Sequence, residues 1–313
     1  MIGAVNARST APSVALVTCS EVPDLDPEGQ HLLAALRERG LDARPVVWDD
    51  EDVDWSAPDL AVVRSTWDYA PRRAEFLAWA ARAADATRLL NPLPLLGWST
   101  DKHYLAELEA AGLPVVPSAF VEVGDEGDHP YLDVEHVVKP AVSAGSRDTL
   151  RLGAHEAARS RAHVAAVHSS GRSVLVQPYL AAVDDVGETA LVFLDGELSH
   201  AMRKAALLPA GGGLVEGLFA HEDMAPREPS AAEVEVGRAV VAEAARRARA
   251  AGAEPMLYAR VDLLPDDDGA PRVLELELVE PSLFLDHAPG SAARLADAVV
   301  RRLADPGGRG TAA

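Results

Sequence analysis

The chain has 313 residues, of which 48% are hydrophobic, so it is long and apolar enough for a buried core and for two domains. Its 29 basic and 49 acidic residues give a formal net charge of −20, which argues against nucleic acid or anionic membranes as partners, because both need basic patches. The single cysteine excludes an internal disulfide and a cysteine metal site, and no apolar run is long enough to span a membrane.

The first hundred residues predict a small parallel α/β domain over 13–97. Apolar runs at 13–19, 43–48 and 60–63 read as buried strands, with Cys19 as a packed thiol, and a helix over 27–39 begins at Pro27 and ends before Gly40. Residues 1–12 are small and polar and are expected to be loose. They lack the features of a signal peptide, so we expect a soluble cytoplasmic protein.

The third strand runs into a polar segment, residues 64–69, that reads Arg-Ser-Thr-Trp-Asp-Tyr. Ligands of open α/β sheets bind beyond the carboxyl ends of strands, so Arg64 and Asp68 are candidates for a substrate rim, with Arg64 gripping a carboxylate. The segment fits equally well a capped turn before a helix at 71–87, with Trp67 as its packing anchor. The residues themselves leave both interpretations open.

Two lysines follow in contexts that suit a phosphate. A Pro-rich linker is expected at 91–97 and a helix at 99–111, with Lys102 in the first turn, where the helix dipole disfavours a cation unless a ligand compensates. Lys139 ends a strand at 136–141. The small residues of the next loop, 143–149, would let backbone N–H groups approach a phosphate, although the segment is not a P-loop.

The next region predicts alternating helices and strands. A helix at 154–169, a strand at 174–180 and a hairpin at 188–204 about Asp195-Gly196 are expected first. The glycines at 211–213 form either a lid over a reacting centre or an ordinary surface connection. Helices at 230–251, capped by Ser230 and Glu233, and at 291–303 complete the pattern, before a disordered tail at 305–313.

The stretch 256–285 carries the most distinctive pattern. Apolar runs at 256–264 and 272–279 flank a loop of Pro, Asp and Gly and predict a hairpin. Side chains alternate along a strand, so Glu275 and Glu277 share a face, and Asp262 can lie across from them. Three clustered carboxylates repel one another unless a divalent cation such as Mg²⁺ binds them, although they could also simply solvate one face of the strand.

Taken together, these segments resemble the ATP-grasp superfamily over essentially the whole chain. The resemblance rests on Lys102 before GLPVVPS and Lys139 in VVKP, on VLVQPYL followed by GETALVFLDGELSHAMRK, and on Asp262 followed by Glu275-Leu-Glu277. It implies an ATP-grasp fold of α/β and α+β class. The N-terminal domain would be followed by two α+β subdomains, 98–175 and 176–304, that clasp ATP.

The resemblance also implies roles for individual residues. Lys102 and Lys139 would hold the phosphates, Glu188 the ribose hydroxyls, and Arg203 the transferred phosphoryl group. The adenine would meet the backbone of Gln177, Pro178, Tyr179 and Leu180. Asp262, Glu275 and Glu277 would bind Mg²⁺, as two ions. The family usually has Asn where this chain has Glu277, which implies tighter metal binding or a shifted preference, for example toward Mn²⁺.

Within the superfamily, the chain is most similar to the cyclo-ligases of D-cycloserine biosynthesis, through RSTWDY, QPYL and LELELVEPSLFL. These enzymes activate the carboxylate of O-ureido-D-serine with ATP and close the ring. The implied substrate residues are Arg64, Asp68, Arg203, Glu280 and Ser282. The alternatives are an intermolecular ligase of the glutathione synthetase type, a non-catalytic nucleotide-binding module and a structural protein with an acidic hairpin. A homodimer is compatible with the sequence.

Overall fold

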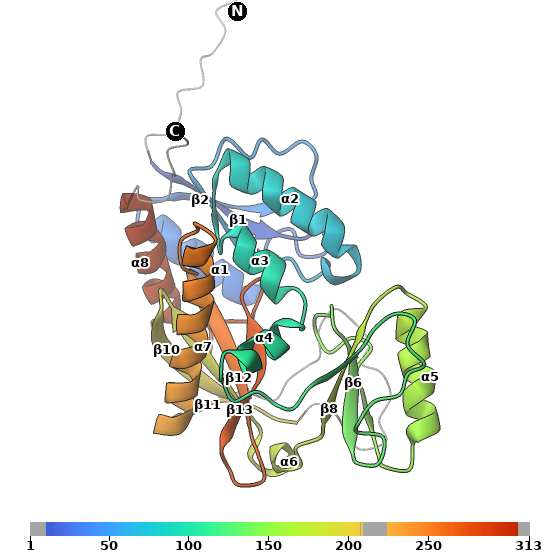
Figure 1. The fold of residues 1–313 in the computed structure, drawn as a ribbon. Coiled ribbons are helices and arrows are strands. Elements are labelled where there is room, and N and C mark those ends of the chain that lie inside the picture. The colour runs from blue at the N-terminus through green and yellow to red at the C-terminus, as the bar shows by residue number, and fades with distance from the viewer. Residues whose placement is uncertain (1–10, 207, 209–223, 306–313) are drawn as a thin grey trace, which may run out of the picture.

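The computed structural model describes residues 11–206, 208 and 224–305, which fold into three sheets (Figure 1). The start of the predicted loose segment (1–10), most of the glycine-rich loop (209–223) and the end of the predicted tail (306–313) lie outside the described residues. The predicted mixed α/β and α+β class is confirmed. Of the helices in the described ranges, none combines the length and apolarity needed to cross a bilayer.

The N-terminal sheet is parallel, as predicted. Its order is β2 (Asp42–Val47), β1 (Ser13–Thr18), β3 (Leu60–Ser65) and β4 (Arg88–Leu90). Helix α1 (Pro27–Glu38) covers one face, and the 3₁₀ turn η1 (Ala70–Arg72) leads to α2 (Arg73–Ala86) on the other. Alternate residues of β1 point to these two faces, so the strand is apolar from Val14 to Val17, and Cys19 after it is buried.

The chain then departs from the prediction. The expected linker at 91–97 contains helix α3 (Leu93–Ser99), which tolerates Pro94 because a proline in the first turn lacks only an unneeded N–H. The expected helix at 99–111 begins late, as α4 (Tyr104–Ala110). Lys102 therefore lies in the turn between two short helices rather than in the first turn of one.

The central sheet is antiparallel and packs against one helix. Its order is β5 (Ala119–Val121), β8 (Val174–Pro178), β6 (His136–Pro140) and β7 (Leu150–Leu152), with α5 (Ala157–His168) on its outer face. The predicted boundary between 175 and 176 falls inside β8, and the domain limits stay a prediction.

The third sheet has five antiparallel strands. Its order is β11 (Met224–Pro226), β10 (Glu197–Lys204), β9 (Glu188–Leu194), β12 (Tyr258–Pro265) and β13 (Pro271–Glu277), and α6 (Ala182–Val186) precedes it. Helix α7 (Ala231–Ala250) begins with the predicted capping box of Ser230 and Glu233. It packs closely on β9, because a Cβ at Gly237 would lie 2.5 Å from Leu191 Cδ1.

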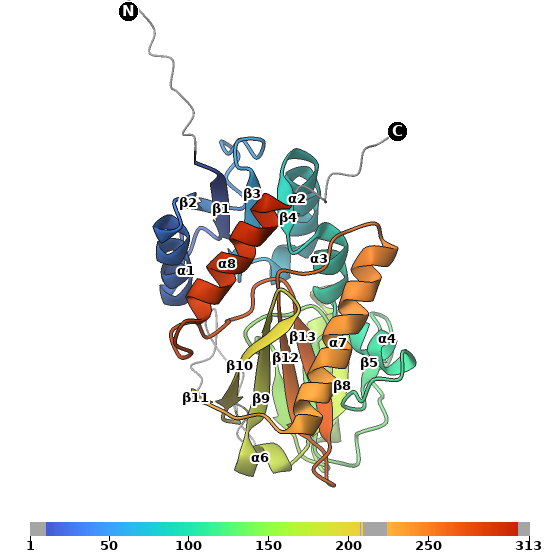
Figure 2. The same ribbon diagram turned by 90° about the vertical axis from the view of Figure 1, so that its left-hand side faces the viewer.

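The last helix, α8 (Ser291–Ala304), joins the N-terminal and five-stranded sheets into one body (Figure 2). Leu295 and Val299 share a buried cluster with Leu36 of α1 and Val192 of β9. Arg39 binds Asp297 at 2.6 Å beside this cluster. The central sheet has no part in this cluster, but its Leu175 packs with Leu191 and Phe193 of the five-stranded sheet in a second buried cluster.

Candidate functional site

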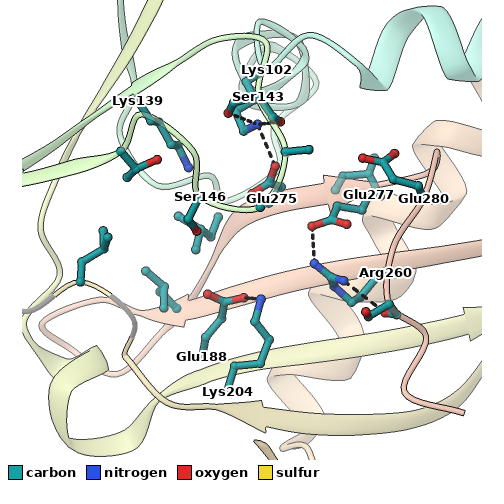
Figure 3. A pocket seen from close by; sticks show the side chains of 18 of the residues that line it. Lys102, Lys139, Ser143, Ser146, Glu188, Lys204, Arg260, Glu275, Glu277 and Glu280 are labelled. Atoms are coloured by element: carbon teal, nitrogen blue, oxygen red, sulfur yellow. Dashed lines mark hydrogen bonds and ion pairs between the residues drawn. The ribbon is translucent and has the colours of Figure 1, made fainter. Parts of the chain in front are cut away.

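A cavity of about 540 Å³ lies where the three sheets meet (Figure 3). The central sheet lines it with Lys139 and Gln177, the five-stranded sheet with its acidic face, and the N-terminal domain with Trp67 and Glu28. The cavity therefore depends on all three parts of the fold.

The predicted hairpin is confirmed, and its register brings the acids together. Asp262 pairs with Glu275 across β12 and β13, and Arg260 pairs with Glu277. Residues two apart in a strand share a face, so these four side chains belong to one face of the sheet. Sequence reasoning missed Arg260, although its spacing of two from Asp262 was a usable signal.

Two cations bind most of these carboxylates. Arg260 Nε donates to Asp262 Oδ1 at 2.8 Å, Nη2 also binds Glu277, and Nη1 donates to the Ser282 carbonyl at 3.1 Å. Lys204 Nζ binds Glu188 and lies 3.0 Å from Asp262 Oδ2. Three carboxylates thus share two cations, which leaves one excess negative charge in a nearly buried cluster.

The burial and the excess negative charge shift the pKa values of the acids in the cluster. Burial raises the pKa of Glu188 to about 8 and that of Glu277 to about 7. Burial also disfavours charge on Asp262, but Arg260 and Lys204 outweigh it and hold its pKa below the usual range. Within the described ranges no three His, Cys, Asp or Glu side chains form a ready metal cluster. The carboxylate oxygens of the cluster nevertheless suit a divalent cation. Its positive charge would offset the excess negative charge, in place of the protons that the raised pKa values favour on Glu188 and Glu277.

The two predicted lysines line the cavity but differ in their contacts. Lys102 Nζ lies 3.0 Å from Glu275 Oε1 and donates to the Ser143 carbonyl at 3.0 Å. Lys139 is 9% exposed, and among the described residues its ammonium makes no hydrogen bond or ion pair. Burial lowers the pKa of Lys139. An unpaired and largely desolvated cation beside the small residues of the 143–146 loop suits an anionic ligand.

The predicted adenine segment, Gln177 to Leu180, also lines the cavity. Gln177 Nε2 donates to Ser118 Oγ at 3.0 Å, and the Arg151 guanidinium lies 3.4 Å from the Tyr179 ring centroid. The segment is therefore held from both sides. Directly after β8, the Tyr179 N–H donates to the Glu135 carbonyl at 2.8 Å and the Leu180 carbonyl accepts from the Val183 N–H at 3.1 Å, so the backbone contact with adenine stays a prediction.

The N-terminal rim differs from the prediction. Arg64 is 2% exposed and does not line the cavity, because its guanidinium binds Glu28 Oε1 at 2.5 Å and stacks near Tyr258. Asp68 accepts from Trp48 Nε1 at 2.9 Å and pairs with Arg72, so it stabilises the turn after β3. Neither residue lines the cavity, and their contacts favour the capped-turn interpretation of this segment.

Other side chains take the place of those two at the rim. Glu28, Trp67, Glu280 and Ser282 line the cavity, and Trp67 Nε1 donates to the Glu280 carbonyl at 3.1 Å. Glu28 lies in α1, far from the polar segment in sequence, so only the packing of α1 on β3 reveals it.

Arg203 is a second correction. Its Nε donates to the Val186 carbonyl at 3.0 Å, and it does not line the cavity, whereas Lys204 does. A regular two-residue hairpin would set Arg203 opposite Glu188. A β-bulge between Leu198 and His200 shifts the register by one, so Lys204 faces Glu188 and Arg203 turns to the other face.

Comparison with known proteins identifies relatives along almost the full length. Residues 14–91 match the family described as D-cycloserine synthetase DcsG, N-terminal domain. The chain is 39% identical over 302 residues to the cycloserine biosynthesis protein DcsG of Streptomyces lavendulae, covering 93% of this chain and 98% of that protein.

Solved structures agree. The crystal structure of D-cycloserine synthetase DcsG superposes with a TM-score of 0.83 at 36% identity, over 93% of this chain and 99% of that one. The D-alanine–D-alanine ligase of Bacillus anthracis complexed with ATP shares the fold, with a TM-score of 0.62 at 15% identity over 94% of this chain and 98% of that one.

Proposed function

This chain belongs to the D-cycloserine synthetase DcsG family, and we propose that it cyclises an O-ureidoserine-like amino acid to D-cycloserine with release of ADP and phosphate. It is an ATP-dependent ligase of the ATP-grasp fold that forms a carbon–nitrogen bond. The observation that carries the proposal is the acidic sheet face, whose Glu275 and Glu277 line the same cavity as Lys102 and Lys139. Asp262 pairs with Glu275 across the two strands but is 1% exposed and lies behind this lining.

The nucleotide would lie between the central and five-stranded sheets. Lys139 and Lys102 would hold its phosphates, with the backbone of the 143–146 loop nearby. The segment from Gln177 to Leu180 would meet the adenine, and Glu188 would bind the ribose. The unpaired state of Lys139 supports this arrangement, because a phosphate would supply the missing partner.

Asp262, Glu275 and Glu277 would hold Mg²⁺, proposed as two ions and replaceable by Mn²⁺. When bound, the metal neutralises phosphate charge and orients the reacting oxygens.

In the proposed reaction the substrate carboxylate attacks the γ-phosphate to give an acyl phosphate and ADP. The ureido nitrogen bonded to oxygen then displaces phosphate and closes the ring, and its carbamoyl group is hydrolysed by one water and leaves as carbon dioxide and ammonia. Arg260 replaces Arg203 as the arginine positioned to offset the developing charge, because its guanidinium lies among the acids of the cavity. Lys204 would assist from β10. The burial of these groups strengthens their interaction with charge and keeps water from the acyl phosphate.

The test is ADP release with Mg-ATP across single amino acids and pairs, including O-ureido-D-serine. Turnover with O-ureidoserine alone supports intramolecular ring closure. Turnover that requires a pair of substrates would replace cyclisation with the intermolecular ligase alternative. The homodimer and the cytoplasmic location stay predictions.

A further inference from the structure

Most carboxylates around the cavity have a partner: Asp26 accepts from Ser65 Oγ at 2.6 Å, Asp286 lies 3.6 Å from His287, and five others are paired with cations. The paired acids are Glu28 with Arg64, Glu188 with Lys204, Asp262 with Arg260, Glu275 with Lys102, and Glu277 with Arg260. Glu280 is only 8% exposed and lines the cavity, yet within the described ranges no hydrogen bond or ion pair reaches its carboxylate. An ionised carboxylate without a partner is costly to bury, so a buried acid left unpaired calls for an explanation.

The backbone that carries Glu280 is rigidly held. Trp67 Nε1 donates to the Glu280 carbonyl at 3.1 Å, and Arg64 Nη2 donates to the Pro281 carbonyl at 3.1 Å. The Leu283 N–H donates to Glu28 Oε1 at 2.9 Å. These contacts fix the segment against the N-terminal domain, so the carboxylate is presented by a preorganised backbone rather than by a free loop.

The unpaired charges lie at the two ends of the site. Figure 3 shows Lys139 on one side of the pocket and Glu280 on the other, with Glu275 and Glu277 between them. Burial, followed by the charge of Glu277, raises the pKa of Glu280 well above its usual range, so a neighbouring cation would favour its ionised form. The site is thus left ready for an anion at one end and a cation at the other.

We propose that Glu280 binds the ammonium group of an α-amino acid substrate and selects for it. The inference rests on the proposed function and adds to it the residue that recognises the substrate's ammonium group. In an α-amino acid the ammonium is one carbon away from the carboxylate. A reacting carboxylate placed at the acidic face beside Arg260 therefore brings the ammonium close to the residue that follows β13 by three positions. The ammonium has three donors and no acceptor, which suits a carboxylate.

The test measures binding rather than turnover, with the nucleotide site filled by a non-hydrolysable ATP analogue and Mg²⁺. Titration calorimetry compares O-ureido-D-serine with its counterpart lacking the amino group, 3-(ureidooxy)propanoate, on wild-type protein and Glu280→Gln. We expect the substitution to weaken the amino compound about 10- to 100-fold, the range for a lost hydrogen bond between charged groups, and to leave the other compound within about twofold. Affinity for the nucleotide analogue should not change.

Glu197→Gln is the matched control, because it makes the same substitution at another carboxylate. Glu197 is exposed at the start of β10 and does not line the cavity, so the loss of its charge should leave the binding of both ligands unaffected. Glu280→Gln should melt at or above the wild-type temperature, because it replaces an unpaired buried acid with a neutral isostere. A folded variant therefore makes the binding result interpretable.

The proposal is overturned if Glu280→Gln binds both compounds as wild type does, as a permanently protonated Glu280 would predict. It is equally overturned if the variant weakens both compounds alike, or if wild type shows no preference for the amino compound. ADP release decides the proposed function separately. An amino compound that binds through Glu280 but is not turned over would refute ring closure and leave the ammonium site standing.

Discussion

The two arginines of the five-stranded sheet allow a sharp test, because the same substitution can be made on either face. Arg260→Lys keeps a positive charge but loses the planar fork. The guanidinium contacts both oxygens of Asp262, with Nε at 2.8 Å from Oδ1 and Nη2 at 2.9 Å from Oδ2, and it also binds Glu277 and the Ser282 carbonyl. A lysine ammonium can satisfy one of the two acids but not both.

The expected loss follows from these contacts. At least one charge-assisted bond and the bond to the carbonyl disappear, which together amount to about 3 kcal/mol at about 1.5 kcal/mol each. At about 1.4 kcal/mol per factor of ten, this corresponds to a decrease in kcat of about 100-fold if the contacts act in the transition state. Arg203→Lys loses one exposed bond to the Val186 carbonyl and should leave kcat within about twofold.

The assay is ADP release at saturating Mg-ATP and O-ureido-D-serine, with melting temperatures to confirm that both variants are folded. Full activity in Arg260→Lys together with a large loss in Arg203→Lys would refute the register and restore the assignment expected from sequence. A loss in both variants would mean that Arg203 acts from the opposite face, which the geometry does not explain.

Three further predictions follow. Glu275→Gln should abolish ADP release yet melt near the wild-type temperature, because Lys102 still donates hydrogen bonds to the carbonyl and hydroxyl oxygens of Ser143. Retained turnover would contradict the assignment of Glu275 as a metal ligand. Lys139→Met should be at least as stable as wild type, since a buried unpaired cation is lost, while calorimetry shows at least about tenfold weaker Mg-ATP binding; unchanged affinity would contradict the phosphate role. Burial lowers the pKa of His129 to about 4, so folding favours its neutral form, and this stability is present above about pH 6.5 and lost as pH falls toward 4. In His129→Gln, the free energy of unfolding measured with urea should change by about 1–2 kcal/mol less over this pH range than in wild type. This value is half of what the pKa shift implies, because His129 is only partly buried, and an unchanged pH dependence would show that His129 is not its source.

The acidic hairpin could be predicted because its pattern is local. Alternation placed Glu275 and Glu277 on one face, and the Asp-rich loop set Asp262 across from them, as the register shows. The same rule applied to Arg260 would have found the missing arginine. The capping box of Ser230 was equally visible, because it depends on residues three apart.

The remaining parts of the site depend on features that no local pattern reveals. The bulge after Leu198 exchanges Arg203 for Lys204, and nothing in the strand marks the extra residue. Arg64 was expected at the rim, but its position is decided by Glu28 of α1, 36 residues away. Strands of three residues, such as β4, β5 and β7, are too short to show any period.

The shared cluster around α8 has a consequence for how the chain folds during synthesis. The N-terminal sheet emerges from the ribosome first, but one of its faces is completed by Leu285, Leu295 and Val299, which are made last. We expect the early sheet to expose Leu16, Leu36 and their neighbours until the end of translation. We therefore expect that the N-terminal domain does not fold as an independent unit, and that its folding is completed only when helix α8 has been synthesised.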